Sequence, residues 1–384
     1  MSCGSSSSQP NSTSFLWVAT QGDQKIRSYT LNQESGQIFA VATDGKPVPT
    51  GVEPSAMVPS PDGKTIFLVN SGGTVTTYTV NPDGSLSAAG SAVNTGDRPV
   101  ALAVDPGGKF LFVANQGTFS DASSGTLSVF SISAGNLSEV PGSPFPTEVL
   151  GEVGGSGPSA VAVSPAGNYL YVANQFANDV QSYSFDSSSG ALTLIGNYGA
   201  GTAPSGLAFS RCAGIASNTA TGTCPAADGS NLFVANSGSN NISIFSACIQ
   251  VSATCSVPNG TLRPIPSGSP VSAGVGPATI FVHPGLDFVY TVDRGSNQVS
   301  EFQYVPATGA LTFLANGSTG ATVFSGDITA QTSNTTQTFN WVVLTNIGGS
   351  SLSIFRVAAA SGKLIAPDSG QFAVEGQPSA ILLR

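Results

Sequence analysis

Residues 157–174 read GPSAVAVSPAGNYLYVAN, and this phrase decides the fold because the chain repeats it. It begins with Pro-Ser and a short apolar run, passes through Ser-Pro-x-Gly, and ends with a second apolar run closed by Val-Ala-Asn. A polar loop and a further strand-like segment follow. Regular recurrence of one unit is typical of repeat architectures.

Both halves of the phrase occur seven times. Copies of the Val-Ala-Asn segment end at Thr20, Asn70, Asn115, Asn174, Asn236, Asp293 and Asn346. Copies of the Pro-Ser segment start at Pro54, Pro99, Pro158, Pro204, Pro277 and Pro378, with a degenerate copy near residues 323–328. Each unit supplies two more strands, and four strands in roughly 45–60 residues are typical of a propeller blade. We therefore expect an all-β, seven-bladed β-propeller.

The two series of copies are offset by one, which predicts how the ring closes. The first Val-Ala segment, residues 17–20, has no Pro-Ser strand before it, and the last Pro-Ser strand, residues 376–383, has nothing after it. The C-terminal strand should therefore pair into the first blade and remove an exposed sheet edge. We expect a disordered Ser-rich tether over 1–14 and one domain over 15–384, with an insertion at 211–227 in the fifth blade.

The hairpin between the two halves has its own chemistry. In Ser60-Pro61-Asp62-Gly63, proline sets φ for the turn and glycine suits the left-handed position that starts the next strand. Helical periodicity is absent from the sequence, which disfavours an α/β fold.

Composition excludes several classes of partner. Charged residues are 9% of the chain, against roughly 25% in an average soluble protein, and the formal net charge is -9. The 12 Lys and Arg residues form no basic run, so nucleic acid and anionic membrane surfaces are poor partners. No run of about 18 apolar residues is present to span a bilayer.

Four of the five cysteines are closely spaced in one region of the chain. Their spacing predicts two short-range disulfides, Cys212 with Cys224 and Cys248 with Cys255, and therefore an exported protein. A zinc site built from all four thiolates is the alternative, but neither pair has the spacing of two to four residues that is common among zinc ligands.

Cys3 stands apart, followed by Gly4 and the serine run 5–8. This segment resembles the start of a mature bacterial lipoprotein, in which an acylated cysteine precedes a Ser/Gly-rich tether. It predicts a lipid anchor on Cys3 in the cell envelope or at the extracellular surface, the one route to a membrane that we expect. The alternative is an incidental thiol on a disordered tail.

The repeats resemble the YVTN-type units of lactonase-like seven-bladed propellers, the group that includes 6-phosphogluconolactonase and carboxymuconate cyclase. The resemblance rests on the Pro-Ser strands, the SPDG turn at 60–63 and the YVAN sequence at 171–174, and it covers residues 15–383. It implies the fold strongly and the chemistry weakly, because the same repeat serves many proteins that are not enzymes.

The catalytic set implied by the resemblance is absent from the matching positions. Enzymes of this group carry Arg-His after one Gly-Pro and a Glu after the next strand, where this chain has Ala278-Thr279 and Arg294. An earlier blade, which carries histidines in those enzymes, here starts with Pro158-Ser159. The sole histidine, His283, occupies a turn that we expect on the opposite face, satisfied by local hydrogen bonds.

The loops before each Pro-Ser and after each Val-Ala-Asn should gather on one face around the axis. The candidate ligand-binding residues there are Glu53, Asp97, Arg98, Gln116, Gln175, Phe176, Asp293, Arg294 and Gln377. The strand-end asparagines should be structural, because they can bond nearby loop backbone. A general base from this set would be Asp97, Glu53 or Asp293. The alternative is that these side chains only line a water-filled channel.

These observations favour an exported, surface-anchored and non-catalytic module, monomeric, that binds a protein, peptide or glycan at the loop face. The alternative is a diverged lactone-ring hydrolase that lacks the usual His, Arg and Glu set. No phosphate loop, zinc signature, calcium loop or Gly-x-Ser-x-Gly elbow is present, so we predict no cofactor, no metal and no nucleic acid partner.

Overall fold

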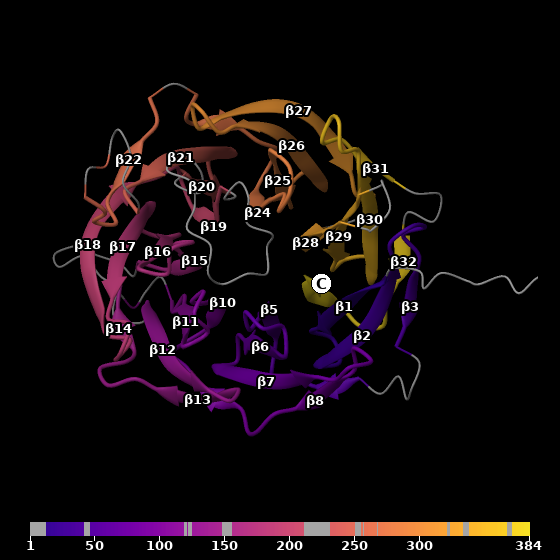
Figure 1. Cartoon of the computed structure of the whole chain (residues 1–384), viewed down its shortest axis with the longest axis horizontal. Helices are drawn as coiled ribbons and strands as arrows, with labels where there is room; N and C mark the ends of the chain where they lie inside the picture. The colour runs from indigo at the N-terminus through magenta and orange to yellow at the C-terminus, as the bar shows by residue number, and fades with distance from the viewer. Residues whose placement is uncertain are drawn as a thin grey trace, which may run out of the picture.

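The computed structural model describes residues 13–41, 47–118, 121, 125–147, 156–210, 231–249, 255, 257–266, 268–320, 323–332, 338–366 and 371–384. Within these residues seven antiparallel sheets form a closed ring of blades, and each blade runs from an inner strand at the axis to an outer strand at the rim (Figure 1). The seven-bladed β-propeller predicted from the repeats is confirmed.

The blades are numbered from the one that contains β1. Blade 1 comprises β33 (Pro378–Leu383), β1 (Thr13–Thr20), β2 (Lys25–Asn32), β3 (Ile38–Ala40) and β4 (Val48–Pro49). Blade 2 comprises β5 (Pro54–Pro59), β6 (Thr65–Asn70), β7 (Thr74–Val80), β8 (Leu86–Ala88) and β9 (Val93–Asn94). Blade 3 comprises β10 (Pro99–Val104), β11 (Phe110–Asn115), β12 (Thr126–Ser133), β13 (Asn136–Glu139) and β14 (Phe145–Pro146). Blade 4 comprises β15 (Pro158–Val163), β16 (Tyr169–Asn174), β17 (Asp179–Phe185) and β18 (Leu192–Gly199).

The remaining three blades complete the ring. Blade 5 comprises β19 (Pro204–Phe209), β20 (Asn231–Asn236), β21 (Asn241–Ala247), β22 (Leu262–Pro264) and β23 (Val271–Ser272). Blade 6 comprises β24 (Pro277–Val282), β25 (Phe288–Asp293), β26 (Gln298–Val305) and β27 (Ala310–Ser318). Blade 7 comprises β28 (Val323–Thr332), β29 (Thr338–Asn346), β30 (Ser351–Val357), β31 (Leu364–Ile365) and β32 (Gln371–Ala373).

The two ends of the chain meet in blade 1. β33 pairs antiparallel with β1, so that Leu16 lies opposite Leu383 and Ala19 opposite Ala380. The predicted closure of the ring is therefore confirmed. β1 begins two residues before the expected boundary at residue 15, because Ser14 is already buried and accepts a hydrogen bond from the amide of Gln33.

The second strand of each blade is apolar on both faces because both faces contact neighbouring blades. In β16, Leu170 and Val172 pack in a cluster with blade 3, whereas Tyr171 between them packs with Leu232 of blade 5. Alternating side chains of one strand therefore fill two different inter-blade cores. This packing explains the continuous apolar run before each Val-Ala-Asn.

The local predictions can be checked in the same way. Gly63 has φ of 71° and its N–H donates to the carbonyl of Ser60, as the SPDG sequence predicted. Cys248 and Cys255 form the predicted disulfide. Cys3, Cys212, Cys224 and the insertion 211–227 lie outside the described residues. No helix in the described part of the chain has the length and apolar character to cross a membrane.

Candidate functional site

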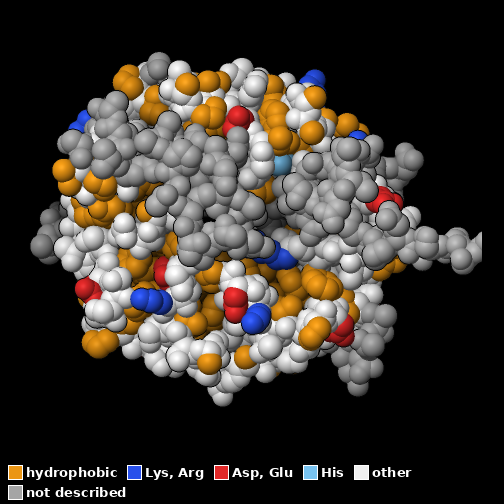
Figure 2. Space-filling model, in the orientation of Figure 1, with side chains coloured by type: hydrophobic (Ala, Val, Ile, Leu, Met, Phe, Trp, Pro, Cys, Tyr) orange, Lys and Arg blue, Asp and Glu red, His pale blue; other side chains and the backbone are white. Residues whose placement is uncertain are grey.

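A cavity of about 820 Å³ runs along the ring axis, walled by the inner strands and open toward the loops that precede them. Among the described residues that line it, Glu53, Arg98 and Arg294 carry a charge. Figure 2 shows acidic and basic side chains scattered over this view rather than gathered in a patch, with hydrophobic side chains visible below the centre of the ring. These three charges therefore define the electrostatics of the part of the wall that the structure describes.

Two repeated loop positions supply the polar side chains at the cavity opening. The pre-proline position, just before the proline of the inner strand, is held by Glu53, Arg98, Gly157, Ala203, Gly276 and Gln377. The post-asparagine position, just after the second strand, is held by Gln21, Ser71, Gln116, Gln175, Ser237 and Arg294. In each of these blades the backbone N–H at the post-asparagine position donates to the carbonyl at the pre-proline position, at 2.7–3.0 Å. These bonds fix both loops at the axis.

The pre-proline position has a left-handed backbone in five of these six blades, which suits glycine. Gly157 and Gly276 both have φ of 64°, whereas Glu53 and Arg98 adopt φ of 56° and 52° with full side chains. Such a conformation costs a non-glycine residue on the order of 1–2 kcal/mol. Two long charged side chains are therefore kept at strained positions facing one cavity.

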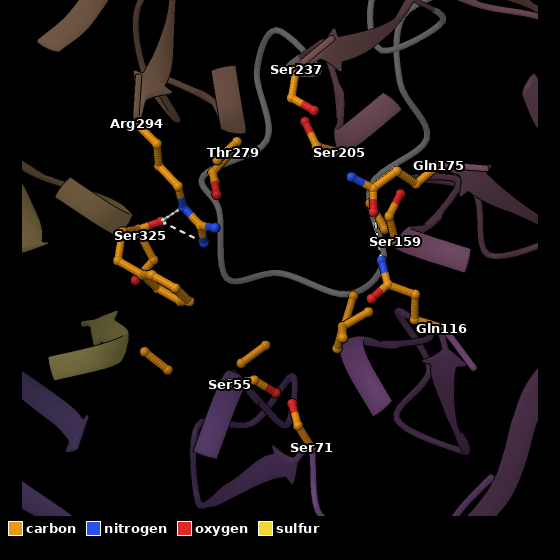
Figure 3. Close-up of a pocket in the computed structure, with 18 of the residues that line it drawn as sticks. Ser55, Ser71, Gln116, Ser159, Gln175, Ser205, Ser237, Thr279, Arg294 and Ser325 are labelled. Atoms are coloured by element: carbon orange, nitrogen blue, oxygen red, sulfur yellow. Dashed lines mark hydrogen bonds between the residues drawn. The ribbon is translucent and has the colours of Figure 1, made fainter. Parts of the chain in front are cut away.

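Arg294 extends from blade 6 against the inner strand of blade 7. Its guanidinium lies 3.8 Å from the ring centre of Phe324, and Nε and Nη2 both donate to the Phe324 carbonyl at 3.4 Å (Figure 3). Surrounding protein lowers the pKa of Arg294 by desolvation, but a guanidinium remains a cation at neutral pH. These long bonds leave the guanidinium able to reorient toward an anionic or carbonyl oxygen.

The glutamines of blades 3 and 4 form a second polar group. The amide of Gln116 donates to the side-chain oxygen of Gln175 at 2.6 Å, and the two side chains face each other in Figure 3. This pair can offer both hydrogen-bond donors and acceptors to a ligand.

The serines that follow the inner-strand prolines join neighbouring blades. Ser159 and Ser205 donate to the proline carbonyl of the next blade at 2.7 and 2.6 Å. Ser55 and Ser379 make the equivalent bonds at 3.3 and 2.5 Å. Because each hydroxyl donates its proton to a carbonyl instead of to a base, these serines are structural and not activated nucleophiles.

The serine series is interrupted in blades 3, 6 and 7, where Val100, Ala278 and Phe324 stand in the position of the serine. Of these three, blades 3 and 6 direct Arg98 and Arg294 into the cavity. Each guanidinium therefore belongs to a blade that lacks the hydroxyl link to its neighbour.

Asp293 lies inside blade 6 and not in the cavity. Its side chain is fully buried and accepts hydrogen bonds from the hydroxyls of Thr291 at 2.8 Å and Ser300 at 2.6 Å. Desolvation raises the pKa of Asp293 to about 6, in spite of these bonds. It occupies the place of the strand-end asparagines, which are buried. Asn70 and Asn236 accept from loop N–H groups as expected. The other asparagines, Asn115, Asn174 and Asn346, donate to side chains of the next strand instead.

The structure separates the predicted residues into two groups. Glu53, Arg98, Gln116, Gln175 and Arg294 line one cavity. Asp97 and Gln377 are exposed on the loops but do not line it, and Phe176 packs against Gly157. Both acidic residues of the Asp-Arg pairs therefore lie away from the cavity that their arginines line.

Sequence reasoning missed several lining residues. Gln21, Ser71 and Ser237 hold the post-asparagine position, so aligning all seven copies would have found them. Phe324 could not be found that way, because its contact with Arg294 joins two blades. His283 is buried in the turn after β24, where Nδ1 accepts from the N–H groups of Gly285 and Leu286, which confirms its predicted local bonding.

Comparison with known proteins identifies the family. The sequence matches the family described as "Lactonase, 7-bladed beta-propeller" over residues 13–142, 123–247 and 227–378, and the chain belongs to this family. No protein of curated function matches the sequence.

Solved structures share the fold across nearly the whole chain. The periplasmic gluconolactonase of Pseudomonas aeruginosa is 22% identical, with a TM-score of 0.72, and the alignment covers 97% of this chain and 99% of that one. A putative 6-phosphogluconolactonase from Bacteroides uniformis is 18% identical, with a TM-score of 0.70 and coverage of 97% and 99%. One from Bacteroides fragilis is 19% identical, with a TM-score of 0.70 and coverage of 98% and 99%. At these identities the likeness shows the fold alone.

Proposed function

We propose that the protein is a lactone hydrolase whose axial cavity uses Glu53, Arg98 and Arg294 in place of the family's usual Arg, His and Glu. The observation that carries this proposal is that the charged groups among the described residues lining the cavity are one carboxylate and two guanidinium groups. Membership of the lactonase family supports it. Ala278, Thr279 and Arg294, which occupy the family's catalytic positions, also line the cavity.

Lactone opening by water needs a base, an oxyanion partner and a proton donor, but no protein nucleophile. Glu53 takes a proton from water while the water oxygen bonds to the carbonyl carbon, and Arg294 stabilises the resulting oxyanion. When the carbonyl re-forms, the ring C–O bond breaks and the ring oxygen takes the proton from Glu53. The product is a hydroxy acid, whose carboxylate Arg98 is placed to bind.

Substitution of the charged residues tests this assignment. Glu53→Gln should lower kcat/KM by about 10²–10⁴-fold because it removes the base, and Arg294→Met by about 10²-fold or more. The measurement is hydrolysis of a panel of sugar and alkyl lactones at neutral pH. Asp97→Asn is the matched control, because Asp97 lies on an equivalent loop outside the cavity. Wild-type rates equal to those in buffer would overturn the proposal.

A non-catalytic binding module is the second candidate. It is favoured by the bonding of the inner-strand serines to carbonyls and by Ala278 and Thr279 at positions where the resemblance implies Arg and His. A protein, peptide or glycan would then contact Arg98 and Arg294 without being converted. Binding that is lost in Arg98→Ala and Arg294→Ala, without turnover of any lactone, would favour this candidate.

We further propose that the protein is exported and anchored through an acylated Cys3. The disulfide between Cys248 and Cys255 supports export, because such bonds persist in oxidising compartments. Mass spectrometry of the membrane fraction of the native host tests the anchor, and an unacylated Cys3 would remove it.

A further inference from the structure

The wall of the axial cavity changes in chemistry with depth. Each inner strand continues from its proline down the axis, at about 3.3 Å per residue. Directly after the proline, four blades have serines that donate to carbonyls. One position further the residues are small in all seven blades: Ala56, Ala101, Ala160, Gly206, Thr279, Ser325 and Ala380. Ala160, Gly206 and Ala380 are buried there, because neighbouring inner strands approach closely at this layer.

Three residues after the proline the wall becomes aliphatic. We call this layer the lower wall; its described lining residues are Met57, Val161, Leu207, Ile280, Gly326 and Ile381. None of these residues has a polar side chain; Met57 and Leu207 are half-buried, whereas Val161, Ile280 and Ile381 are buried and pack into the inter-blade cores. The lower wall lies about 10 Å along the strands from the prolines.

The two ends of the cavity therefore suit different parts of one ligand. Arg98, Arg294 and the paired glutamines offer charge and hydrogen bonds at the opening, whereas the lower wall offers contact to hydrocarbon. A sugar lactone has hydroxyls on almost every ring carbon, and those hydroxyls would lose water against aliphatic side chains without gaining partners. A hydrocarbon chain would gain by the same transfer.

We propose that the cavity is selective for amphipathic ligands, namely lactones that carry an unbranched hydrocarbon chain, with the lactone group at the arginines and the chain against the lower wall. This selectivity rests on the proposed hydrolase function for the lactone part, but the binding of an amphipathic anion does not depend on it. The volume of about 820 Å³ accommodates a ligand of this size.

Two experiments, one on binding and one on hydrolysis, separate the proposed ligand class from the proposed reaction. In the first, straight-chain alkanoates from acetate to decanoate are bound to the wild-type protein and followed by calorimetry. In the second, γ-lactones with alkyl chains of increasing length are hydrolysed, with glucono-δ-lactone as the sugar reference. Affinity and kcat/KM should each rise by about fourfold per buried methylene until the lower wall is covered.

The possible outcomes are distinct. Chain-length dependence in binding without hydrolysis supports the ligand class and overturns the hydrolase. Hydrolysis that is independent of chain length, or fastest with glucono-δ-lactone, overturns the ligand class and leaves the hydrolase. Absence of both overturns both.

Variants of the lower wall locate the effect. Leu207→Asn and Met57→Gln keep side-chain volume but add an amide, and each should reduce the gain per methylene to less than twofold. Leu102→Asn is the matched control, because Leu102 stands three residues after its proline in blade 3 but does not line the cavity. Equal chain-length dependence in all four proteins would contradict the placement of the chain.

Discussion

At the residue scale, the strand-end asparagine shows how one side chain can hold a loop in place by hydrogen bonds. Asn236 accepts from the N–H of Gly201 at 3.1 Å and donates to Ser243 at 3.0 Å, so it ties a loop to two strands. Asp293 holds the same place in blade 6 but must bury a carboxyl group to do so. Burial without a cation makes the ionised form costly, which is why the pKa of Asp293 is raised.

Asp293→Asn should therefore stabilise the protein at neutral pH. The folded-state pKa of about 6 lies above the usual 3.8, so the stability that Asp293 contributes is present below pH 4 and is lost as pH rises through 6. Replacement by asparagine should raise the free energy of unfolding at pH 7.5 by on the order of 2–3 kcal/mol, with little effect at pH 4. Urea unfolding at both pH values measures this, with Asp97→Asn as the exposed control. An equal effect at both pH values would show that ionisation of Asp293 does not cause the change in stability.

The direction of single side chains also explains which of the predicted residues line the cavity. Neighbouring residues point in different directions at a strand end, so only one member of each Asp-Arg pair lines the cavity. Arg98 and Arg294 do so, whereas Asp97 stays on the loop and Asp293 is buried. The sequence shows which residues are charged, but the direction in which each charged side chain points depends on the twist and burial of its strand.

At the element scale, the inner strands are joined by hydroxyls as well as by apolar packing. Ser205 bonds the Pro277 carbonyl of the next blade, and Ser159 bonds the Pro204 carbonyl. The repeated Pro-Ser pair therefore has a structural reason, since the serine side chain reaches across to the following blade. Sequence reasoning found the repeat but not this bond, because the partner lies in another blade.

Loss of one such hydroxyl should weaken the junction between two blades. Ser205→Ala should lower the free energy of unfolding by about 1–2 kcal/mol, because the Pro277 carbonyl loses a donor. Thermal or urea unfolding measures the change. Ser131→Ala is the comparison, because the Ser131 hydroxyl bonds a carbonyl at the exposed rim, and it should cost less than about 0.5 kcal/mol. Similar losses for both variants would argue against a special role for the inner bond.

At the scale of the whole molecule, blade 1 joins the two ends of the chain with charge in addition to strand pairing. Thr20 and Arg27 occupy the places that asparagine and serine hold in other blades. Arg27 donates to Thr20 at 2.8 Å, to Asp23 at 2.5 Å and to Glu375, just before the C-terminal strand, at 3.0 Å. A guanidinium that is only 8% exposed therefore bonds segments from both ends of the sequence.

Arg27→Met should loosen the closure of the ring. Burial opposes ionisation of Asp23, but the bonds from Arg27 and Thr20 outweigh it and lower the pKa of that carboxyl. The stabilisation is thus present above pH 4 and is lost as pH falls further. We expect a loss of about 1–3 kcal/mol at pH 7 that shrinks below pH 4. Chemical unfolding measures it, with Lys64→Met at an exposed turn as the control. A loss of the same size at pH 3 would exclude the ion pair as its cause.

The sequence by itself determined the number of blades, the closure by the C-terminal strand and the pairing of Cys248 with Cys255. The first two follow from a local pattern that recurs along the chain, so a count of its copies is enough to find them, and the third follows from the short spacing of the two cysteines. Only the tertiary structure decided which charges share the axial cavity, which hydroxyls join blades and that Phe324 lies beneath Arg294. Those contacts join residues from different blades, and their geometry exists only once the ring has closed and packing has fixed each strand end.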